Sequence, residues 1–224
     1  MPKLTWDQVG KRFYETGTRN GVMALQTSDG GYSAPVAWNG LTKVTESPEG
    51  GEETALYADD IKYLSLYSAE NLKGTIEAYT YPDEFAECDG IAEASTGVLV
   101  YQQDRKSFGL AYTTRIGNDT VGNAYGDKIH IIYGVKVSPS ERAYETVNES
   151  PAAINFSWAF STTPVDMGAN MKPSALITID TTKAPAAGVQ SLKDLLYGTD
   201  AEEPKFPTPE EVLALFPSAP PPGS

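Results

Sequence analysis

The segment richest in residue types that could take part in catalysis is residues 77–90, EAYTYPDEFAECDG, which holds the only cysteine of the chain, Cys88. Carboxylates surround this cysteine, and they are Glu77, Asp83, Glu84, Glu87, Asp89 and, slightly further on, Glu93. A nucleophilic cysteine needs a nearby cation or a helix N-terminus to lower the pKa of its thiol. Negative neighbours act in the opposite direction, so we expect Cys88 to have a structural role.

The other catalytic residue types do not form a constellation either. The single histidine, His130, lies inside a strand pattern, where a surface or packing role is expected. A Ser-His-Asp triad would have to use it, and no G-x-S-x-G turn is present to expose a serine. The cluster of Asp83, Glu84 and Glu87 leaves an acidic hydrolase open as an alternative, although 30 Asp and Glu residues create pairs by chance. We predict that the protein is not an enzyme.

Metal and cofactor motifs are also missing from the sequence. The polar segment 117–127, GNDTVGNAYGD, offers Asn118, Asp119 and Asp127, but their spacing does not follow the alternation of a calcium-binding loop. One cysteine and one histidine are too few for a usual zinc site, and no phosphate-binding glycine loop or dinucleotide fingerprint occurs. We therefore predict no metal site and no cofactor.

The charge balance is strongly acidic, with 17 Lys and Arg against 30 Asp and Glu and a formal net charge of −13 at pH 7. Proteins that bind nucleic acid attract its phosphates through clustered Lys and Arg, so ordinary nucleic-acid binding is disfavoured. The same repulsion would let DNA slide past a surface without adhering to it. No segment approaches the roughly 18 apolar residues of a membrane-spanning helix, so we expect no membrane association.

Alternation of apolar and polar residues over residues 22–180 predicts a mainly β protein. In residues 153–160, one face carries Ile154, Phe156, Trp158 and Phe160. In residues 128–137, one face carries Ile129, Ile131, Tyr133, Val135 and Val137, with His130 opposite. Further strands are predicted at 32–38, 41–46, 61–67, 74–81, 97–101, 108–116 and 175–180. Turn residues between these segments favour an antiparallel β-sandwich or barrel.

One to three short helices are expected to flank this β-rich body. Residues 81–88 and 185–198 have helical spacing and end signals, and Thr208 with Glu211 forms a capping box before a third helix. Two polar segments, 46–54 and 138–151, are long enough to project as loops. We assign residues 1–200 to the β domain and residues 201–224 to a linker, a short helix and a disordered tail.

Five long segments, in order along the chain, resemble the major tail protein of long-tailed, non-contractile bacteriophages, which is the subunit of the tail tube. They are WNGLTKVTESPEGGE, ALYADDIKYLSLYSAENLKGTIEAYTYPDEFAECDG, FGLAYTTRIGNDTVG, KIHIIYGVKVSPSERAYETVN and FSWAFSTTPV. The resemblance runs from Trp6 to Gly198 and continues weakly into FPTPEEVLALF. It implies a sandwich or barrel of the tail-tube type with flanking helices.

The resemblance further implies a structural virion protein that assembles into stacked hexameric rings around a bore for genome ejection. Its partners would be further copies of itself, the tape-measure protein inside the tube, and the tail-terminator and tail-tip proteins. Genomic DNA would pass without specific binding, repelled by carboxylates along the bore. The protein would be made in the cytoplasm of the host bacterium and would end in the tail of the virion.

The family also has a long loop between early strands that reaches the next ring. The corresponding residues here are Glu46, Ser47, Pro48, Glu49, Gly50, Gly51, Glu52 and Glu53, which we expect to become ordered on assembly. A second expected subunit contact comprises Asp83, Glu84, Phe85 and Glu87. Two alternatives stand beside these expectations: a mobile hairpin without a partner, and a β-sandwich module that binds carbohydrate or a host surface through its tyrosines.

Overall fold

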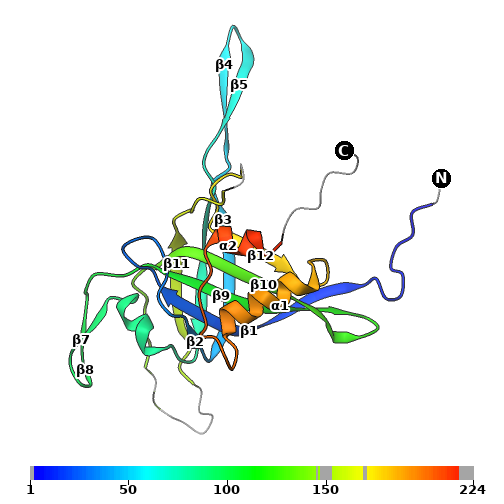
Figure 1. The fold of residues 1–224 in the computed structure, drawn as a ribbon. Coiled ribbons are helices and arrows are strands. Elements are labelled where there is room, and N and C mark those ends of the chain that lie inside the picture. Colours follow the sequence, from blue (N-terminus) through cyan, green and yellow to red (C-terminus); the bar gives the residue numbers. More distant parts are fainter. Residues whose placement is uncertain (1–2, 145, 147–152, 169–170, 217–224) are drawn as a thin grey trace.

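A computed structural model describes residues 3–144, 146, 153–168 and 171–216 (Figure 1). The strands are β1 (Phe13–Leu25), β2 (Val36–Trp38), β3 (Leu41–Glu49), β4 (Glu53–Ala58), β5 (Ile61–Tyr67), β6 (Asn71–Ala78), β7 (Ile91–Ser95), β8 (Val98–Tyr101), β9 (Phe108–Asn118), β10 (Gly122–Val137), β11 (Phe156–Thr162) and β12 (Leu176–Asp180). The helices are η1 (Asp83–Glu87), α1 (Ala186–Tyr197) and α2 (Pro209–Ala214). The predicted mainly β class with short flanking helices is confirmed.

The main sheet is antiparallel and open. Its order is β2-β1-β9-β10-β11-β6-β3, with β12 paired to β10 beside this path. The hairpins β4–β5 and β7–β8 form separate two-stranded sheets. Among the described residues no strand joins β2 to β3, so the sheet does not close into a barrel. β3 is therefore an outer strand, and it contains Pro48, a residue that edge strands tolerate because proline has no backbone N–H.

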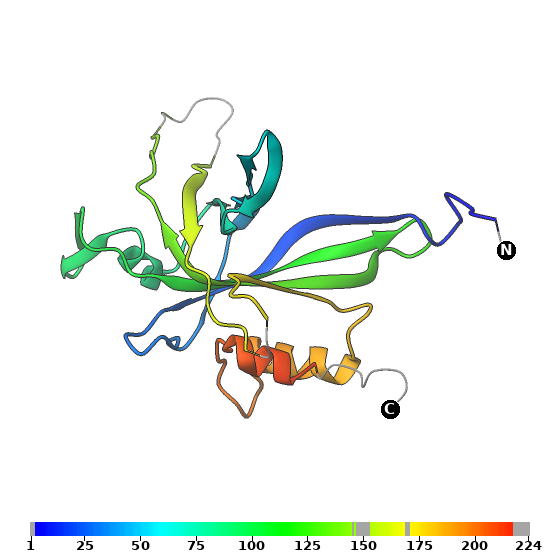
Figure 2. The same ribbon diagram turned by 90° about the horizontal axis from the view of Figure 1, so that it is seen from above.

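Each face of the main sheet has its own hydrophobic cluster. On one face, α1 and α2 contribute Leu192, Leu196 and Val212, none of which is more than 1% exposed. Figure 2 shows both helices lying along this face only. The opposite cluster includes Phe85 of η1 and two tryptophans, whose ring centroids lie 4.6 Å and 4.9 Å from the Phe85 ring. Both faces of the central strands are thus buried.

Strand β10 departs from the single apolar face predicted for residues 128–137. Ile131 belongs to the cluster under the helices, whereas Val135 and Val137 belong to the opposite cluster. The cause is a β-bulge: the register with β9 shifts just before Val135, and Gly134 has a φ of 58°. One inserted residue reverses the alternation beyond it, so β10 exchanges its faces at this glycine.

The segment after α1 packs on the body through α2 and the residue Phe206. Phe206 is 2% exposed, and its ring centroid lies 4.8 Å from that of Tyr32. The predicted capping box is confirmed, because the Thr208 side chain accepts a hydrogen bond from the Glu211 backbone N–H and the Glu211 side chain binds the Thr208 backbone. The segment predicted as a linker is therefore held against the core, and the predicted tail from residue 217 onward lies outside the described residues. No helix in the described part of the chain is both long enough and apolar enough to cross a bilayer.

Candidate assembly surface

The β4–β5 hairpin projects from the body as a two-stranded ribbon (Figure 1). Almost every residue of both strands is exposed. Seven large apolar or aromatic side chains are among them, namely Leu56, Tyr57, Ile61, Tyr63, Leu64, Leu66 and Tyr67. A lone two-stranded hairpin is marginally stable in water, and contiguous exposed apolar side chains mark interaction surfaces. This hairpin is the strongest candidate for a contact with another chain.

The residues predicted as a projecting loop form the base of this hairpin instead. Glu46, Ser47, Pro48 and Glu49 belong to β3 and extend its pairing with β6, and Glu53 begins β4. Only Gly50, Gly51 and Glu52 lie between the two strands. Proline and acidic residues disfavour an interior strand, but β3 is an outer strand and tolerates them. The projecting element is thus longer than predicted and reaches Tyr67.

Gly50 fixes how the hairpin leaves the sheet. Its φ is 95°, and a Cβ there would lie 2.1 Å from the Ala69 carbonyl oxygen. We expect Gly50→Ala to destabilise the hairpin base by roughly 1–3 kcal/mol, because both backbone conformation and space exclude a side chain. Hydrogen exchange should accelerate in β4 and β5 but not in β9. Gly51→Ala is the control, since Gly51 shares a positive φ but has no atom within 4 Å of its Cβ position; equal effects would contradict the steric explanation.

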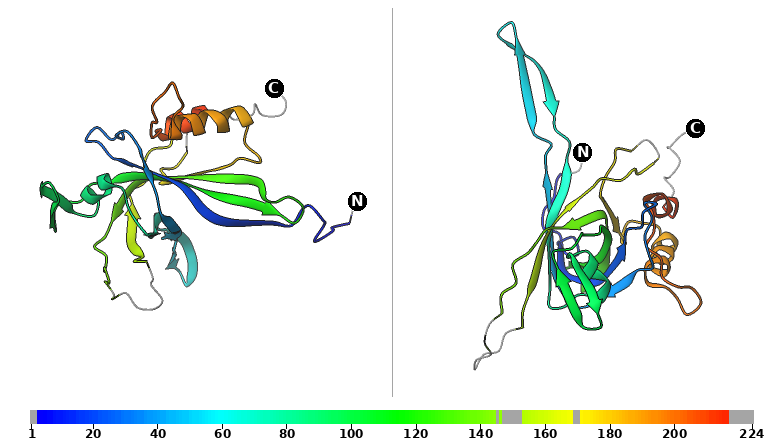
Figure 3. Two further views of the ribbon diagram at one scale, coloured as in Figure 1. Left: turned by 90° about the horizontal axis from the view of Figure 1, so that it is seen from below. Right: turned by 90° about the vertical axis from the view of Figure 1, so that its left-hand side faces the viewer.

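Groups of exposed apolar side chains also occur on the β7–β8 hairpin and near the N-terminus. On the β7–β8 hairpin they are Val98, Leu99, Val100 and Tyr101. On the N-terminal segment and the adjoining strand ends they are Leu4, Trp6, Val9, Phe13, Tyr14, Val121 and Tyr125. Figure 3 shows that these projections leave the body in different directions from the β4–β5 hairpin. The described part of the chain therefore exposes apolar side chains on several separate surfaces.

The acidic segment predicted as a subunit contact forms η1. Asp83, Glu84 and Glu87 are exposed and available to a partner. Phe85 is fully buried in the core, so its side chain is not a surface contact. An apolar residue within a short acidic helix has no periodic signal that would reveal which side faces the core. The prediction that Phe85 contacts another subunit is therefore wrong, because its side chain lies in the core.

Cys88 follows η1, and its side chain is fully buried. Burial is the main cause that raises the pKa of its thiol to about 12, and the carboxylate of Glu87 adds to this effect. At neutral pH the group is consequently a thiol rather than the thiolate that nucleophilic catalysis requires. The structure agrees with the structural role expected for Cys88.

Asp89 is the centre of a buried polar network beside η1. It is 7% exposed, and its carboxylate accepts hydrogen bonds from the Trp158 indole N–H at 3.1 Å and from the guanidinium of Arg142. Arg105 donates to the Asp89 backbone carbonyl at 2.9 Å and lies 3.6 Å from the carboxylate. The Arg142 guanidinium also lies 5.5 Å from the ring centroid of Tyr101. Two cations thus share one carboxylate.

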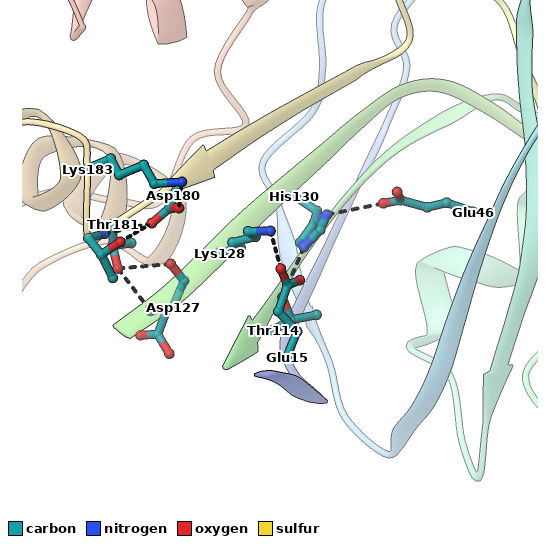
Figure 4. A network of polar contacts seen from close by, with 10 residues as sticks. Glu15, Glu46, Thr114, Asp127, Lys128, His130, Asp180, Thr181 and Lys183 are labelled. Carbon is teal, nitrogen blue, oxygen red and sulfur yellow. Dashed lines mark hydrogen bonds and ion pairs between the residues drawn. The ribbon is translucent and has the colours of Figure 1, made fainter. Parts of the chain in front are cut away.

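His130 is buried rather than at the surface, and it links β10 to β3 and β9. Figure 4 shows it between Glu46 and Thr114: its Nδ1 lies 3.1 Å from the Glu46 carboxylate and its Nε2 lies 3.1 Å from the Thr114 hydroxyl. The Tyr112 ring stacks on the imidazole at 4.7 Å, and its hydroxyl donates to Glu46. The contact across the sheet places Glu46 in the body of the protein.

The order threonine, histidine, glutamate has the connectivity of a catalytic triad. A working triad also needs backbone N–H groups directed at the oxyanion of the intermediate. Thr114 lies within β9 and pairs with Lys128, and the neighbouring Thr113 pairs with Ile129 and Arg19, so the surrounding backbone belongs to the sheet. The geometry therefore favours a structural tie across the curled sheet over an acyl-transfer site.

The hydrogen bond with His130 is the main cause that lowers the pKa of Glu46 from its ordinary value of 4.5, while partial burial opposes the shift. A depressed pKa means that this carboxylate stabilises the fold above pH 4.5 and loses that contribution as the pH falls through the lowered value. Glu46→Gln should therefore cost roughly 1–3 kcal/mol near pH 6, and less at pH 3. Urea unfolding at both pH values tests this, and a difference that does not change with pH would refute it.

The polar segment 117–127 serves the β9–β10 turn and its neighbours. Asn118 Oδ1 accepts from the backbone N–H groups of Thr120 and Val121, and Asp119 accepts from that of Gly10. Within the described residues, no group of three or more His, Cys, Asp and Glu side chains is arranged to hold a metal ion.

A comparison of the chain with protein-family models finds no match, and a comparison with curated proteins finds none either.

Proposed function

We propose that the protein is a structural subunit that self-assembles into stacked hexameric rings of the phage tail-tube type. The β4–β5 hairpin carries the proposal, because it projects seven large apolar side chains that the single chain leaves exposed. Such a ribbon gains stability only when a partner covers it. The choice of stacked hexameric rings as the assembly rests on the resemblance of five sequence segments to the tail-tube subunit.

The open sheet supports ring formation. Strands β2 and β3 stand at opposite ends of its strand order. An outer strand of one copy can extend the sheet of the next copy, and repetition with a fixed rotation closes a ring. Closure of this kind would remove exposed strand edges and create, from several copies, the barrel that one copy does not form.

The acidic character supports the role of a conduit. A formal net charge of −13 would repel DNA phosphates wherever carboxylates face the bore, so the genome would pass without specific binding. In this proposal the tape-measure protein occupies the tube during assembly, and the terminator and tip proteins cap its ends. The protein would be made in the host bacterial cytoplasm and would reside in the virion tail.

Negative-stain electron microscopy of the concentrated full chain tests the proposal. Rings or tubes of uniform width are the expected result, and sedimentation velocity should show large species that grow with protein concentration. A chain that stays monomeric at every concentration would refute self-assembly. A persistent monomer with affinity for glycans would instead favour the carbohydrate-binding or host-surface module.

A further inference from the structure

A pocket of ≈ 500 Å³ opens next to the buried Asp89 network. Its lining comes from the segment after η1, from the end of β8 with the segment that follows it, and from the segment after β10. The residues are Asp89, Tyr101, Gln102, Gln103, Arg105, Pro139, Ser140 and Arg142. The two arginines of this set only donate hydrogen bonds, whereas its tyrosine, glutamine and serine side chains can donate or accept. The pocket therefore offers two guanidiniums to an acceptor.

The charges in this pocket do not balance. Arg105 and Arg142 both face the single carboxylate of Asp89, which leaves an excess of one positive charge. The Nε–H of Arg105 is buried and has no hydrogen-bond acceptor among the described residues. A net cationic pocket on a chain with a net charge of −13 is unusual, and an anionic group would complete it.

The tip of the β4–β5 hairpin carries two carboxylates that have no ion-pair partner among the described residues. Asp59 and Asp60 are exposed and form the two-residue turn between the strands. The charged residues paired within the hairpin are Glu53 and Lys62, and no described cation pairs with either aspartate. The tip thus has two carboxylates that face solvent in the single chain.

The backbone of this turn accommodates both aspartates. Asp59 and Asp60 have φ values of 51° and 61°, the pattern of a type I′ turn, in which glycine is strongly favoured at the second position. Aspartate tolerates this left-handed conformation better than most other residues. The turn therefore holds two carboxylates next to each other at the end of the hairpin.

The tip and the pocket lie toward opposite ends of the molecule. In Figure 1 the β4–β5 hairpin points upward, whereas β7–β8 lies at the lower left, and the right-hand view of Figure 3 shows the same separation. A tip therefore cannot fill the pocket of its own chain without refolding. Copies arranged head to tail would bring the tip of one to the pocket of another.

We infer that the Asp59 and Asp60 carboxylates of one copy dock into the Arg105 and Arg142 pocket of the next copy. Charge-assisted hydrogen bonds to two guanidiniums would anchor the tip, and exposed tyrosines beside it would pack on Tyr101 at the rim. This inference rests on the proposed function, and it names the receiving site for the stacking of one ring on another.

Neutralising the tip is the first test. Asp59→Asn with Asp60→Asn removes both charges, and asparagine keeps the turn conformation. We expect the protein concentration needed for tube formation to rise roughly tenfold or more, and the dependence of assembly on salt to weaken. The control is Glu202→Gln with Glu203→Gln, two exposed carboxylates in the segment between α1 and α2, which Figure 1 shows away from the β4–β5 hairpin. An equal effect of both pairs would mean that overall charge, and not docking, controls assembly, which would overturn the inference.

Disulfide cross-linking is the second test, and it separates docking from the proposed function. Asp60→Cys with Gln103→Cys should give a ladder of covalent multimers after mild oxidation of assembled protein, because a disulfide requires Cα atoms within about 7 Å. The native Cys88 is buried and will not compete. Each single variant should stop at dimers. Tubes without a ladder would overturn the docking alone, whereas an unmodified chain that forms no tubes at any concentration would overturn the proposed function as well.

Discussion

Replacing Asp89 with alanine should lower the free energy of unfolding by about 3–5 kcal/mol. The carboxylate is the common acceptor for the Arg142 guanidinium and the Trp158 indole N–H, and it also offsets the charge of Arg105. Its removal would leave the Trp158 indole and the Arg142 guanidinium without their acceptor and Arg105 without its ion-pair partner. Such losses are much larger than the net value of one hydrogen bond. Urea unfolding followed by tryptophan fluorescence measures the effect.

Two variants control this prediction. Asp89→Asn keeps the shape and an acceptor oxygen for the indole, so its cost should lie between that of the alanine variant and zero. Asp104→Ala removes an exposed carboxylate from the same region and should change stability by less than about 0.5 kcal/mol. An Asp89→Ala variant as stable as Asp104→Ala would show that the network contributes nothing to the fold.

Deleting Glu53–Tyr67 should raise the protein concentration needed for tube formation by roughly a hundredfold or more, since more than 2.7 kcal/mol of contact energy per subunit would be lost. The subunit itself should stay folded, because β4 and β5 pair only with each other and β3 keeps its partner β6. Gly50, Gly51 and Glu52 with Ser68, Ala69 and Glu70 would form the shortened connection. Circular dichroism and negative-stain microscopy on the same samples give both readouts.

The bounds of this deletion matter. Removing residues 46–53, the segment predicted as the inter-ring loop, would take away half of β3 and the Glu46 tie to His130. Loss of assembly in that variant would report a damaged fold rather than a lost contact. Tubes of unchanged length and stability in the Glu53–Tyr67 deletion would rule the hairpin out as the stacking element.

Local patterns in the sequence predicted much of the fold. The bounds of β5 match the prediction because a run rich in aliphatic and aromatic residues is preceded by Asp59 and Asp60 and followed by small and polar residues, and the start of α2 follows from the capping box at Thr208. The face exchange in β10 could not be predicted, since a glycine inside an apolar run does not reveal that one residue is inserted relative to the partner strand. The helix positions, several strands and the antiparallel class could be predicted, whereas β1, β4, β7 and the register could not.

The polar contacts were harder to predict from the sequence than the strands and helices that carry them. Asp89 was counted among the carboxylates around Cys88, but its partner Arg142 lies 53 residues further along the chain. Glu46 and His130 are 84 residues apart, and only the curl of the sheet brings them together. The exposed hairpin was underestimated because Pro48 interrupts the pattern of β3. Contacts between distant segments depend on topology, which no local motif encodes.

The proline in outer strand β3 has a consequence for the protein before it finds its partners. A subunit with open sheet edges, held at high concentration, risks growing into cross-β aggregates by indiscriminate strand addition. Pro48 lacks the amide hydrogen that such a ladder would need, so an incoming strand can extend along only part of this edge. The same residue would restrict amyloid growth while leaving the earlier part of β3 free for ordered pairing. Pro48 would therefore disfavour aggregation without preventing assembly.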